Sequence, residues 1–347
     1  MTVIADARTA ARRLGDHPQD HGWRELYRLF AYGLEREAPE LTEAVATLCK
    51  ARSECSSTHL LTLLGIAVKE VTGDGFATLI EPSAPATQRL GALEATLRDR
   101  GEQIAGILTM RQNSFTAARR FMVVQVLLGA YFRIPPTPPV NFADLGTGLG
   151  ILPRQLNSRA LFERYSGELR WAGRKPAFQA VPLNARFGVE RGPRPDLRWV
   201  RACYGATDYY RRLFQELELS RRVHEVEQAQ VTYEEFDILD YQELIRFVSH
   251  REINVVNLSY VLYEIDAERR SRIIEVLREN LRPPGIIIVT EPVAELTKPG
   301  CTVSLYDESR ADPQRLCTVS DGHFRGDVQP LEDYASFASR YPISFAM

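Results

Sequence analysis

A short run of acid and glycine residues carries the clearest chemical signal in this chain of 347 residues. It follows an apolar stretch at 140–145 and reads Asp144-Leu145-Gly146-Thr147-Gly148-Leu149-Gly150. Glycine lacks a Cβ, so alternating glycines predict a tight turn at which backbone amides approach a ligand closely. A helix that begins behind the turn offers unpaired N–H groups and the positive end of its dipole. The run is therefore typical of a nucleotide-like cofactor site at the end of a strand.

The spacing of the glycines favours one cofactor class over another. Dinucleotide sites have the pattern G-x-G-x-x-G, whose third glycine comes one residue later than Gly150 does here. Asp144, two residues before the first glycine, would be poorly placed beside a pyrophosphate. It suits a cofactor with a cationic amino-acid end, such as S-adenosylmethionine. No lysine has a tyrosine four positions before it, so the Tyr-x-x-x-Lys pair of short-chain dehydrogenases is absent.

Short apolar runs separated by helical spacing surround and follow this motif. We expect strands at 140–145, 186–189, 231–238, 254–259 and 285–290, a helix at 267–281, and two strand-like runs near 302–305 and 316–319. Short, nearly all-apolar strands that alternate with helices imply a parallel sheet covered on both faces. The sequence therefore predicts an α/β fold with a mostly parallel sheet that ends in an antiparallel C-terminal part.

The first 131 residues have a different periodicity. Apolar residues recur there at steps of three and four, from Trp23 through Leu128, which predicts an all-helical region. Pro135, Pro136, Pro138 and Pro139 then interrupt helix continuation. We expect a helical N-terminal (cap) domain over 1–131 and a cofactor-binding domain over 132–347. An insertion near 155–185 is too long for a simple loop and is a candidate lid, although its Trp171 suits a core position equally well.

Composition and charge exclude several function classes. The formal net charge of −2 lacks the basic footprint of a nucleic-acid binder. No run of eighteen apolar residues predicts a membrane span, and residues 1–20 have no apolar core of a secretory signal. The five cysteines form no C-x-x-C pair, so we expect reduced thiols in the cytoplasm. Neither cysteines nor histidines have metal-ligand spacing, and no metal is expected.

Several segments in order make this sequence resemble the class I S-adenosylmethionine-dependent methyltransferases. Besides the glycine run, they are Phe187-Gly-Val-Glu190-Arg-Gly-Pro193, Phe236-Asp237-Ile238, Asn254-Val-Val-Asn257-Leu-Ser259 and Leu281 through Pro292. The matching segments cover residues 140 to 292. The resemblance implies a Rossmann-like sheet, with S-adenosyl-L-methionine as the cofactor.

The resemblance also implies roles for individual residues. The glycine run (Asp144, Gly146, Thr147, Gly148 and Gly150) would hold the amino-acid end of the cofactor. Glu190 would hold the ribose hydroxyls, although it follows Gly150 by forty positions; Glu168 is the alternative at a more usual distance. Asp237 would contact the adenine amino group and Ile238 would stack on the ring. Asn257 and Ser259 would wall the methyl-transfer pocket.

A polar segment at 111–120 interrupts the apolar helical region and has two interpretations. It is either a solvated helix face or a helix over the cofactor cleft that offers Asn113 or Arg119 to a carboxylate. The whole layout is also similar to that of an uncharacterised bacterial family, which pairs such a segment with a methyltransferase-like half. This second resemblance supports the layout, and Glu190 after a long insertion, but it implies no activity.

We expect methyl transfer to a small-molecule acceptor, with secondary metabolism as one setting. The protein would contribute mainly by holding donor and acceptor in line and excluding water. An amine or hydroxyl acceptor also needs a base. Tyr263 and Glu264 are the catalytic candidates, with Glu291 and His323 as further ones. Residues such as Tyr263 and Glu264 more often belong to an ordinary helix start than to a catalytic site.

Two alternatives share the cofactor motif. One is attack on another carbon of the sulfonium, as in aminocarboxypropyl transfer or cyclisation. The other is a catalytically silent protein with the same fold. The sequence leaves open the acceptor, the methylated atom and the oligomeric state, a homo-oligomer included.

Overall fold

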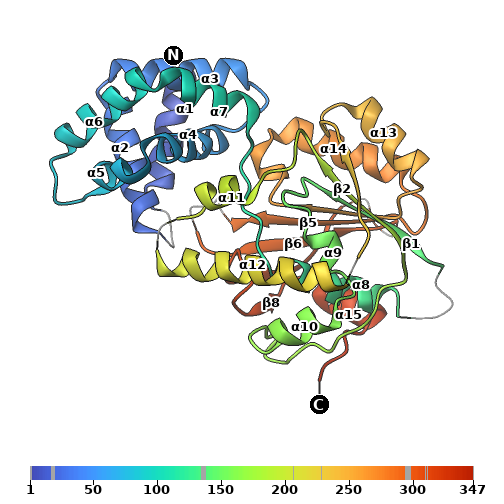
Figure 1. Cartoon of the computed structure of the whole chain (residues 1–347). Helices are drawn as coiled ribbons and strands as arrows, with labels where there is room; N and C mark the ends of the chain where they lie inside the picture. The colour runs from blue at the N-terminus through green and yellow to red at the C-terminus, as the bar shows by residue number, and fades with distance from the viewer. Residues whose placement is uncertain are drawn as a thin grey trace.

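The computed structural model describes residues 2–16, 20–133, 138–205, 207–227, 229–293, 298–308, 310 and 312–346. A helical part lies beside an α/β part, and the N-terminus is at the far side of the helical part from the C-terminus (Figure 1). Pro135 and Pro136 of the expected boundary lie outside the described residues.

Seven α-helices and a 3-10 turn form the helical part that the structure describes before residue 111. They are α1 (Thr2–Leu14), α2 (His21–Glu35), α3 (Pro39–Ala51), α4 (Ser57–Thr72), η1 (Gly73–Gly75), α5 (Phe76–Ile80), α6 (Ala86–Asp99) and α7 (Gly101–Met110). Side chains cap two of them, because Asp20 accepts a hydrogen bond from the amide of Trp23 and Ser56 from that of His59. The apolar spacing between Leu93 and Leu108 belongs to two helices, α6 and α7, which meet at Arg100.

Helix α8 (Phe121–Tyr131) continues the helical periodicity but packs with the sheet. Its residues from Phe121 to Ala130 are all buried, as expected for a helix that is apolar on every side. Conversely, α11 (Leu197–Cys203) and α12 (Asp208–Glu227) contribute Trp199 and Leu217 to the core of the helical part. Each part therefore includes a helix that the sequence assigns to the other part. A domain boundary at residue 131 stays a prediction.

The described strands form one sheet in the order β3-β2-β1-β4-β5-β6-β7-β8. They are β1 (Val140–Leu145), β2 (Leu183–Glu190), β3 (Thr232–Glu235), β4 (Val255–Ser259), β5 (Ile286–Pro292), β6 (Cys301–Tyr306), β7 (Gln314–Val319) and β8 (Val328–Pro330). Strands β1 to β5 are parallel, and β6, β7 and β8 add antiparallel neighbours. The predicted fold class, a mostly parallel Rossmann-like sheet with an antiparallel C-terminal part and a helical N-terminal region, is confirmed. The sequence analysis missed β8.

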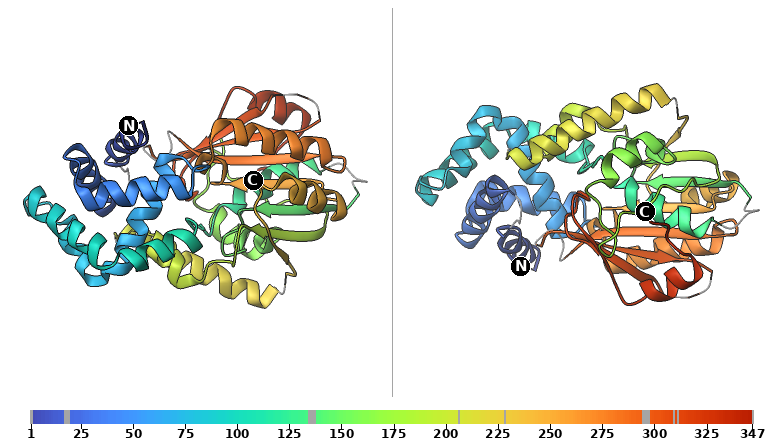
Figure 2. Two further views of the ribbon diagram at one scale, coloured as in Figure 1. Left: turned by 90° about the horizontal axis from the view of Figure 1, so that it is seen from above. Right: turned by 90° about the horizontal axis from the view of Figure 1, so that it is seen from below.

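Helices cover both faces of the sheet. The remaining elements are α9 (Leu152–Gln155), α10 (Arg159–Ser166), α13 (Tyr241–His250), η2 (Leu262–Glu264), α14 (Ala267–Asn280) and α15 (Tyr334–Arg340). In Figure 1, α13 and α14 lie above the sheet, while α8, α10 and α15 lie below it. Figure 2 shows the helical part against one end of the sheet in both views, with α12 running alongside. Among the described residues, no helix is both long and apolar enough to cross a membrane.

The insertion at 155–185 packs beneath the sheet instead of over its carboxyl edge. Trp171 is fully buried in the same core as α8, and its backbone pairs with Val328. The amide of Ala177 donates to the carbonyl of Ser344, which ties the insertion to the C-terminal segment. The lid expectation is therefore wrong for the parts of this insertion that contain Trp171 and Ala177: these residues extend the core.

Candidate functional site

A cavity lies where the carboxyl ends of the central strands meet the helical part. Parallel strands end at the same edge of a sheet, and the neighbouring pairs β1·β2 and β1·β4 bring their last residues together there. The cavity encloses about 890 Å³, part of which is open to solvent. The cavity is therefore an open cleft between the sheet and the helical part, the kind of place where small-molecule ligands bind.

Two walls enclose this cavity. The strand wall consists of residues at or after strand ends: Gly146, Gly148, Val189, Glu190, Arg191, Phe236, Asp237, Ile238, Leu239, Ser259, Tyr260, Val261, Glu264 and Ile265. The cap wall comes from earlier in the chain: Glu54, Cys55, Gln112, Asn113, Ser114, Phe115, Thr116 and Arg120. The cavity therefore brings together residues that lie far apart in the sequence.

The glycine turn has the conformation that its sequence predicts. Gly146, Gly148 and Gly150 have φ angles of 72°, 56° and 70°, in the left-handed region that favours glycine. A Cβ at Gly148 would lie 2.6 Å from the Thr116 hydroxyl oxygen. A Cβ at Gly150 would overlap the ring of Tyr233, whose hydroxyl donates to the Gly150 carbonyl. Gly146 and Gly148 thus face the cavity, whereas Gly150 makes room for a side chain of β3.

Asp144 braces the turn from behind the cavity wall. Its carboxylate accepts hydrogen bonds from the Thr147 hydroxyl at 2.9 Å and from the Asn257 side-chain amide at 2.7 Å. Burial raises the pKa of Asp144 to about 6, against the lowering effect of these two bonds. Asp144, Thr147 and Asn257 are buried and do not line the cavity. Their direct contact with a cofactor therefore stays a prediction.

Glu190 lies at the end of β2 and faces the cavity. Its carboxylate accepts the amide N–H of Gly148 at 2.7 Å, which couples it to the glycine turn. Burial raises the pKa of Glu190 to about 7, although this hydrogen bond acts in the opposite direction. The alternative residue, Glu168, is instead an ion-pair partner of Arg119. The geometry therefore favours Glu190 of the two.

The third acidic motif also reaches the cavity. Asp237 and Ile238 both line it, directly after β3. The Asp237 carboxylate contacts the Arg191 guanidinium at 2.8 Å and accepts the amide of Leu239 at 2.9 Å. Arg191 pairs in turn with Glu54 of the cap wall at 3.0 Å. Asp237 is thus held in place by a cation that also joins the two walls.

The segment after β4 is fixed by Glu291 of β5. Its carboxylate accepts three backbone amides, at 3.3 Å from Val261, 2.9 Å from Leu262 and 2.7 Å from Tyr263. Burial raises the pKa of Glu291 to about 7. This bracing holds Ser259 in the strand wall. With its carboxylate engaged by the backbone, Glu291 is a structural residue and a poor base candidate.

The two predicted catalytic residues differ in their surroundings. Tyr263 is buried and does not line the cavity. Burial raises the pKa of Tyr263 well above its ordinary value, and the Glu264 charge adds to this, so the phenol stays protonated. Glu264 lines the cavity. A base role for Glu264 stays a prediction, and the surroundings of Tyr263 do not favour one for it.

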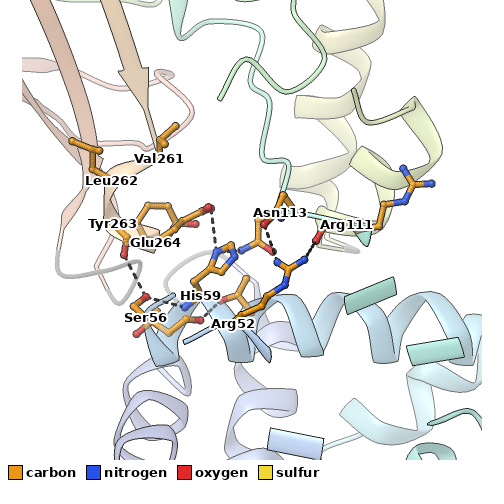
Figure 3. A network of polar contacts seen from close by, with 12 residues as sticks. Arg52, Ser56, His59, Arg111, Asn113, Val261, Leu262, Tyr263 and Glu264 are labelled. Atoms are coloured by element: carbon orange, nitrogen blue, oxygen red, sulfur yellow. Dashed lines mark hydrogen bonds and ion pairs between the residues drawn. The ribbon is translucent and has the colours of Figure 1, made fainter. Parts of the chain in front are cut away.

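A buried histidine links Glu264 to the cap wall (Figure 3). His59 of α4 is fully buried, and its Nδ1 lies 3.2 Å from the Glu264 carboxylate and 3.0 Å from the Asn113 amide nitrogen. The amide of Ser56 donates to the Glu264 carbonyl at 2.9 Å, and Arg52 bonds the carbonyl of Arg111. His59 could not be predicted from the sequence, because nothing in the residues around it marks a site.

The polar segment at 111–120 has no regular secondary structure over 111–117 and is not helical as expected. It lies over the cavity all the same, and Asn113 lines it as predicted. Arg119 points elsewhere: its guanidinium binds Glu216 at 2.9 and 2.7 Å and Glu168 at 2.7 Å. Arg119 is therefore engaged with two carboxylates away from the cavity, and the predicted cofactor contact is wrong for this residue.

The neighbouring Arg120 takes the position predicted for Arg119. It is 8% exposed, lines the cavity, and stacks on the Tyr260 ring at 4.0 Å. Its guanidinium forms no ion pair with any described carboxylate, and its Nε has no partner. Its charge does act at a distance on Asp144. A buried cation facing a cavity without a counter-ion is suited to an anionic group of a ligand.

The chain matches no protein-family model and no curated protein. Among solved structures, PKMT2 from Rickettsia typhi is similar to 51% of this chain, with 19% identity and a TM-score of 0.25. A putative S-adenosyl-L-methionine-dependent methyltransferase from Methanococcus maripaludis is similar to 50%, with 11% identity and a TM-score of 0.25. This chain spans only 26% and 59% of the lengths of these two proteins.

A third structure is similar over nearly the whole length. It is an O-methyltransferase family 2 protein from Planctomyces limnophilus, solved in complex with apigenin. The match covers 99% of this chain and 92% of that protein, with 13% identity and a TM-score of 0.29. At TM-scores this low, none of the three similarities carries an argument about function, which must come from the geometry of the site.

Proposed function

We propose that the cavity binds S-adenosyl-L-methionine and that the protein transfers its methyl group to a small-molecule acceptor. One observation carries the proposal. Three motifs from different parts of the chain, represented by Gly148, Glu190 and Asp237, converge on one cavity at the carboxyl edge of a parallel sheet. That edge is where open α/β sheets bind nucleotide-like ligands.

The residues of the cavity fit the two ends of this cofactor. An adenosine end presents hydroxyl and amino groups. The carboxylates of Glu190 and Asp237 can accept hydrogen bonds from them. An amino-acid end presents a carboxylate, for which Arg120 offers an unpaired cation. Between these two ends, the turn has no side chains at Gly146 and Gly148 and leaves its backbone accessible to the cofactor. Apolar contact with a flat base would come from Ile238 and Phe236.

When bound, the cofactor supplies a methyl carbon that the positive sulfur already activates. The residues of this chain therefore have to orient the donor and the acceptor, enclose them, and exclude water. Proximity of this kind contributes several kcal/mol to a reaction, on the order of 7–11 in favourable cases. Glu264, which contacts His59, and His323 remain base candidates for an acceptor proton.

Calorimetric titration with S-adenosylhomocysteine tests the cofactor site without depending on turnover. Glu190→Ala should weaken binding by about 1–3 kcal/mol, or roughly 5- to 150-fold, because two hydroxyl partners are lost. Glu235→Gln is the matched control, since Glu235 pairs in register with Glu190 on β3 but is exposed and outside the cavity. Unaltered protein that fails to bind the nucleoside would refute the proposal.

Product mass separates methyl transfer from the other chemistry of the same cofactor. Methyl transfer leaves S-adenosylhomocysteine, whereas aminocarboxypropyl transfer leaves methylthioadenosine. Detection of methylthioadenosine as the product would keep the cofactor site and replace the reaction. Tight binding of the cofactor without any product, across a panel of acceptors, would favour a silent protein.

A further inference from the structure

A groove between α3 and α7 lies outside the proposed cofactor site. Both helices run along the top of the helical part in Figure 1. The groove measures about 1240 Å³, which includes space open to solvent. Its floor consists of side chains that are buried in the helical core: Leu48, Leu97, Ile104 and Leu108. Small residues beside this floor leave it open: Ala44, Ala51, Gly101 and Ala105. An apolar floor under open space is suited to an apolar ligand chain.

The two ends of the groove differ in charge. Glu40 and Glu43 line it at the start of α3, where Glu40 pairs with Arg98 at 2.9 Å. Arg52, directly after α3, and Arg191 line the other end. At 1.5 Å per residue, Arg52 lies about 14 Å from Glu43 along the helix. This cationic end adjoins the cavity of the proposed cofactor site, the first cavity, because Arg191 lines that cavity too.

Arg52 is a buried cation that forms no ion pair with any carboxylate in the part of the chain that the structure describes. It is 6% exposed. Its guanidinium donates to the carbonyls of Thr109 and Arg111 and to the side-chain oxygen of Gln112 (Figure 3). These three oxygens are neutral groups with only partial charges, so no full negative charge faces the guanidinium. A buried cation in this state favours an anionic ligand.

A second guanidinium lies near Arg52. Burial lowers the pKa of Arg52, and the charge of Arg191 lowers it further, so the two cations repel each other. Arg191 has its own partners, Glu54 at 3.0 Å and Asp237 at 2.8 Å. The charges of Glu54 and Glu264 act on Arg52 in the opposite direction, but only at longer range. An anion at this end of the groove would therefore pair with Arg52 and relieve the repulsion.

We propose that this groove is a second ligand site, and that its ligand is a monocarboxylic acid with an unbranched apolar chain. The carboxylate lies at Arg52 beside Arg191, and the chain extends along α3 over Leu48 and Ile104. Because Arg52 is nearly covered, an anionic group has to reach it end-on, which a terminal carboxylate does. A guanidinium also matches a carboxylate in shape. The site needs no methyl donor, so this inference stands apart from the proposed function.

Calorimetry with a series of fatty acids, all below their micellar concentrations, tests both ends of the ligand. Decanoate should bind, and affinity should fall by about fourfold for each methylene removed towards hexanoate, because each buried methylene contributes a similar amount. Decyltrimethylammonium has a similar chain but a cationic head, and should bind at least about tenfold more weakly, since the charged contact is lost. Equal binding of these two amphiphiles, or an affinity independent of chain length, would overturn the proposal.

A larger side chain in the groove tests its location. Ala105→Trp should weaken decanoate binding by about tenfold or more, because the ring fills the groove from α7. Ala46→Trp is the matched control, since Ala46 is also exposed on a helix but does not line the groove. Ala51→Trp is the second variant should Ala105→Trp fail to fold. Unchanged affinity in both groove variants would show that the acid binds elsewhere.

Arg52→Gln separates the charge from the packing. Glutamine keeps an amide donor for the carbonyls that Arg52 binds, but it removes the cation. Decanoate affinity should fall by about tenfold or more, while the change per methylene stays the same because the chain contacts are unaltered. Arg98→Gln, at the acidic end of the groove, is the control and should change affinity by less than about twofold. Unchanged affinity in Arg52→Gln would overturn the placement of the carboxylate.

The remaining outcomes separate this inference from the first cavity and from a protein partner. Arg120→Met should leave decanoate binding unchanged; a loss there, or full competition by S-adenosylhomocysteine, would place the acid in the first cavity instead. Protein that binds the nucleoside but not decanoate overturns this inference alone, and the reverse result overturns the proposed function alone. A dimer that Ala105→Trp converts to monomers, without any decanoate binding, would assign the groove to a second copy of the chain and overturn the proposal.

Discussion

The strand wall and the cap wall of the first cavity are held together by different forces. The strand wall follows from sheet register, because Asp144 pairs with Gly188 on one side and Asn257 on the other. Besides one backbone bridge between Cys55 and Ile265, the cap wall depends on single side-chain contacts, such as Thr116 with the amide of Leu149 at 3.3 Å and Arg191 with Glu54. The backbone hydrogen bonds of the sheet fix the residues of the strand wall cooperatively. Each side-chain contact of the cap wall contributes only about 0.5–1.5 kcal/mol to stability. We therefore expect cofactor affinity to be most sensitive to the strand wall.

The glycine turn should give the largest effect. Gly148→Asp places a Cβ 2.6 Å from the Thr116 hydroxyl and a second carboxylate beside Glu190. We expect S-adenosylhomocysteine affinity to fall by about 100-fold or more by calorimetry, since like charges and lost space act together. Gly173→Asp is the control for backbone strain, because Gly173 has a φ of 77° with open space around it. Equal losses of affinity in both variants would show that the turn at Gly148 has no special role in binding the nucleoside.

A substitution of Arg120 measures how much a charged contact from the cap wall contributes to nucleoside affinity, compared with the contacts of the strand wall. Arg120→Met keeps the length of the side chain but removes the cation that faces the cavity, and should weaken nucleoside binding by about 10- to 100-fold. Arg119→Met is the matched control. It should keep the affinity and lower the free energy of unfolding by about 2–3 kcal/mol, because Glu216 loses its buried partner. The reverse result would restore the contact predicted for Arg119.

The pH dependence of binding sharpens the role of Glu190. Its pKa of about 7 means that the carboxylate is mostly protonated at pH 6 and mostly ionised at pH 8. The ionised carboxylate accepts hydroxyl hydrogen bonds more strongly than the protonated form does, so affinity should rise by up to about tenfold across this range. Glu190→Gln should bind more weakly and remove this rise, while Glu291→Gln should retain it. A flat profile for the unaltered protein would contradict this assignment.

The same carboxyl groups should make stability pH-dependent. The pKa values of Glu190 and Glu291 are about 7 in the folded protein against 4.5 ordinarily, so the folded state binds more protons between these values. The free energy of unfolding should therefore fall as the pH rises from about 4.5 to about 7. Chemical denaturation at several pH values measures this, and the fall should be smaller in Glu190→Gln and Glu291→Gln.

His59 should give the smallest change in affinity. His59→Ala removes the contacts of Nδ1 with Glu264 and Asn113, which join the cap wall to the segment after β4. We expect affinity for the nucleoside to fall less than fivefold and the free energy of unfolding by about 1–3 kcal/mol. His59→Asn, which keeps a polar atom near the position of Nδ1, should recover part of the stability. A larger loss of affinity than in Gly148→Asp would reverse the comparison of the two walls.

Helix periodicity located most elements but not their partners. The apolar residues of α8 predicted a helix correctly, yet the pattern is equally suited to a helical bundle and to the face of a sheet. The three-residue strand β8 lacks the length over which alternation can be recognised. The segment at 111–117 is irregular because its side chains and backbone bond to other elements, as Gln112 does to Arg52 and Trp199. Tertiary contacts of this kind override local propensity.

The sequence by itself determined the strand wall, because a strand, a left-handed glycine turn and an acid at the strand end are set by neighbours in the chain. Only the tertiary structure decided the cap wall. It chose Arg120 over Arg119, buried His59 beside Glu264, and placed Trp23 and Tyr210 around a common cavity. His59 and Glu264 are 205 positions apart, and Trp23 and Tyr210 are 187 apart; packing between elements, which no local pattern encodes, brings them together.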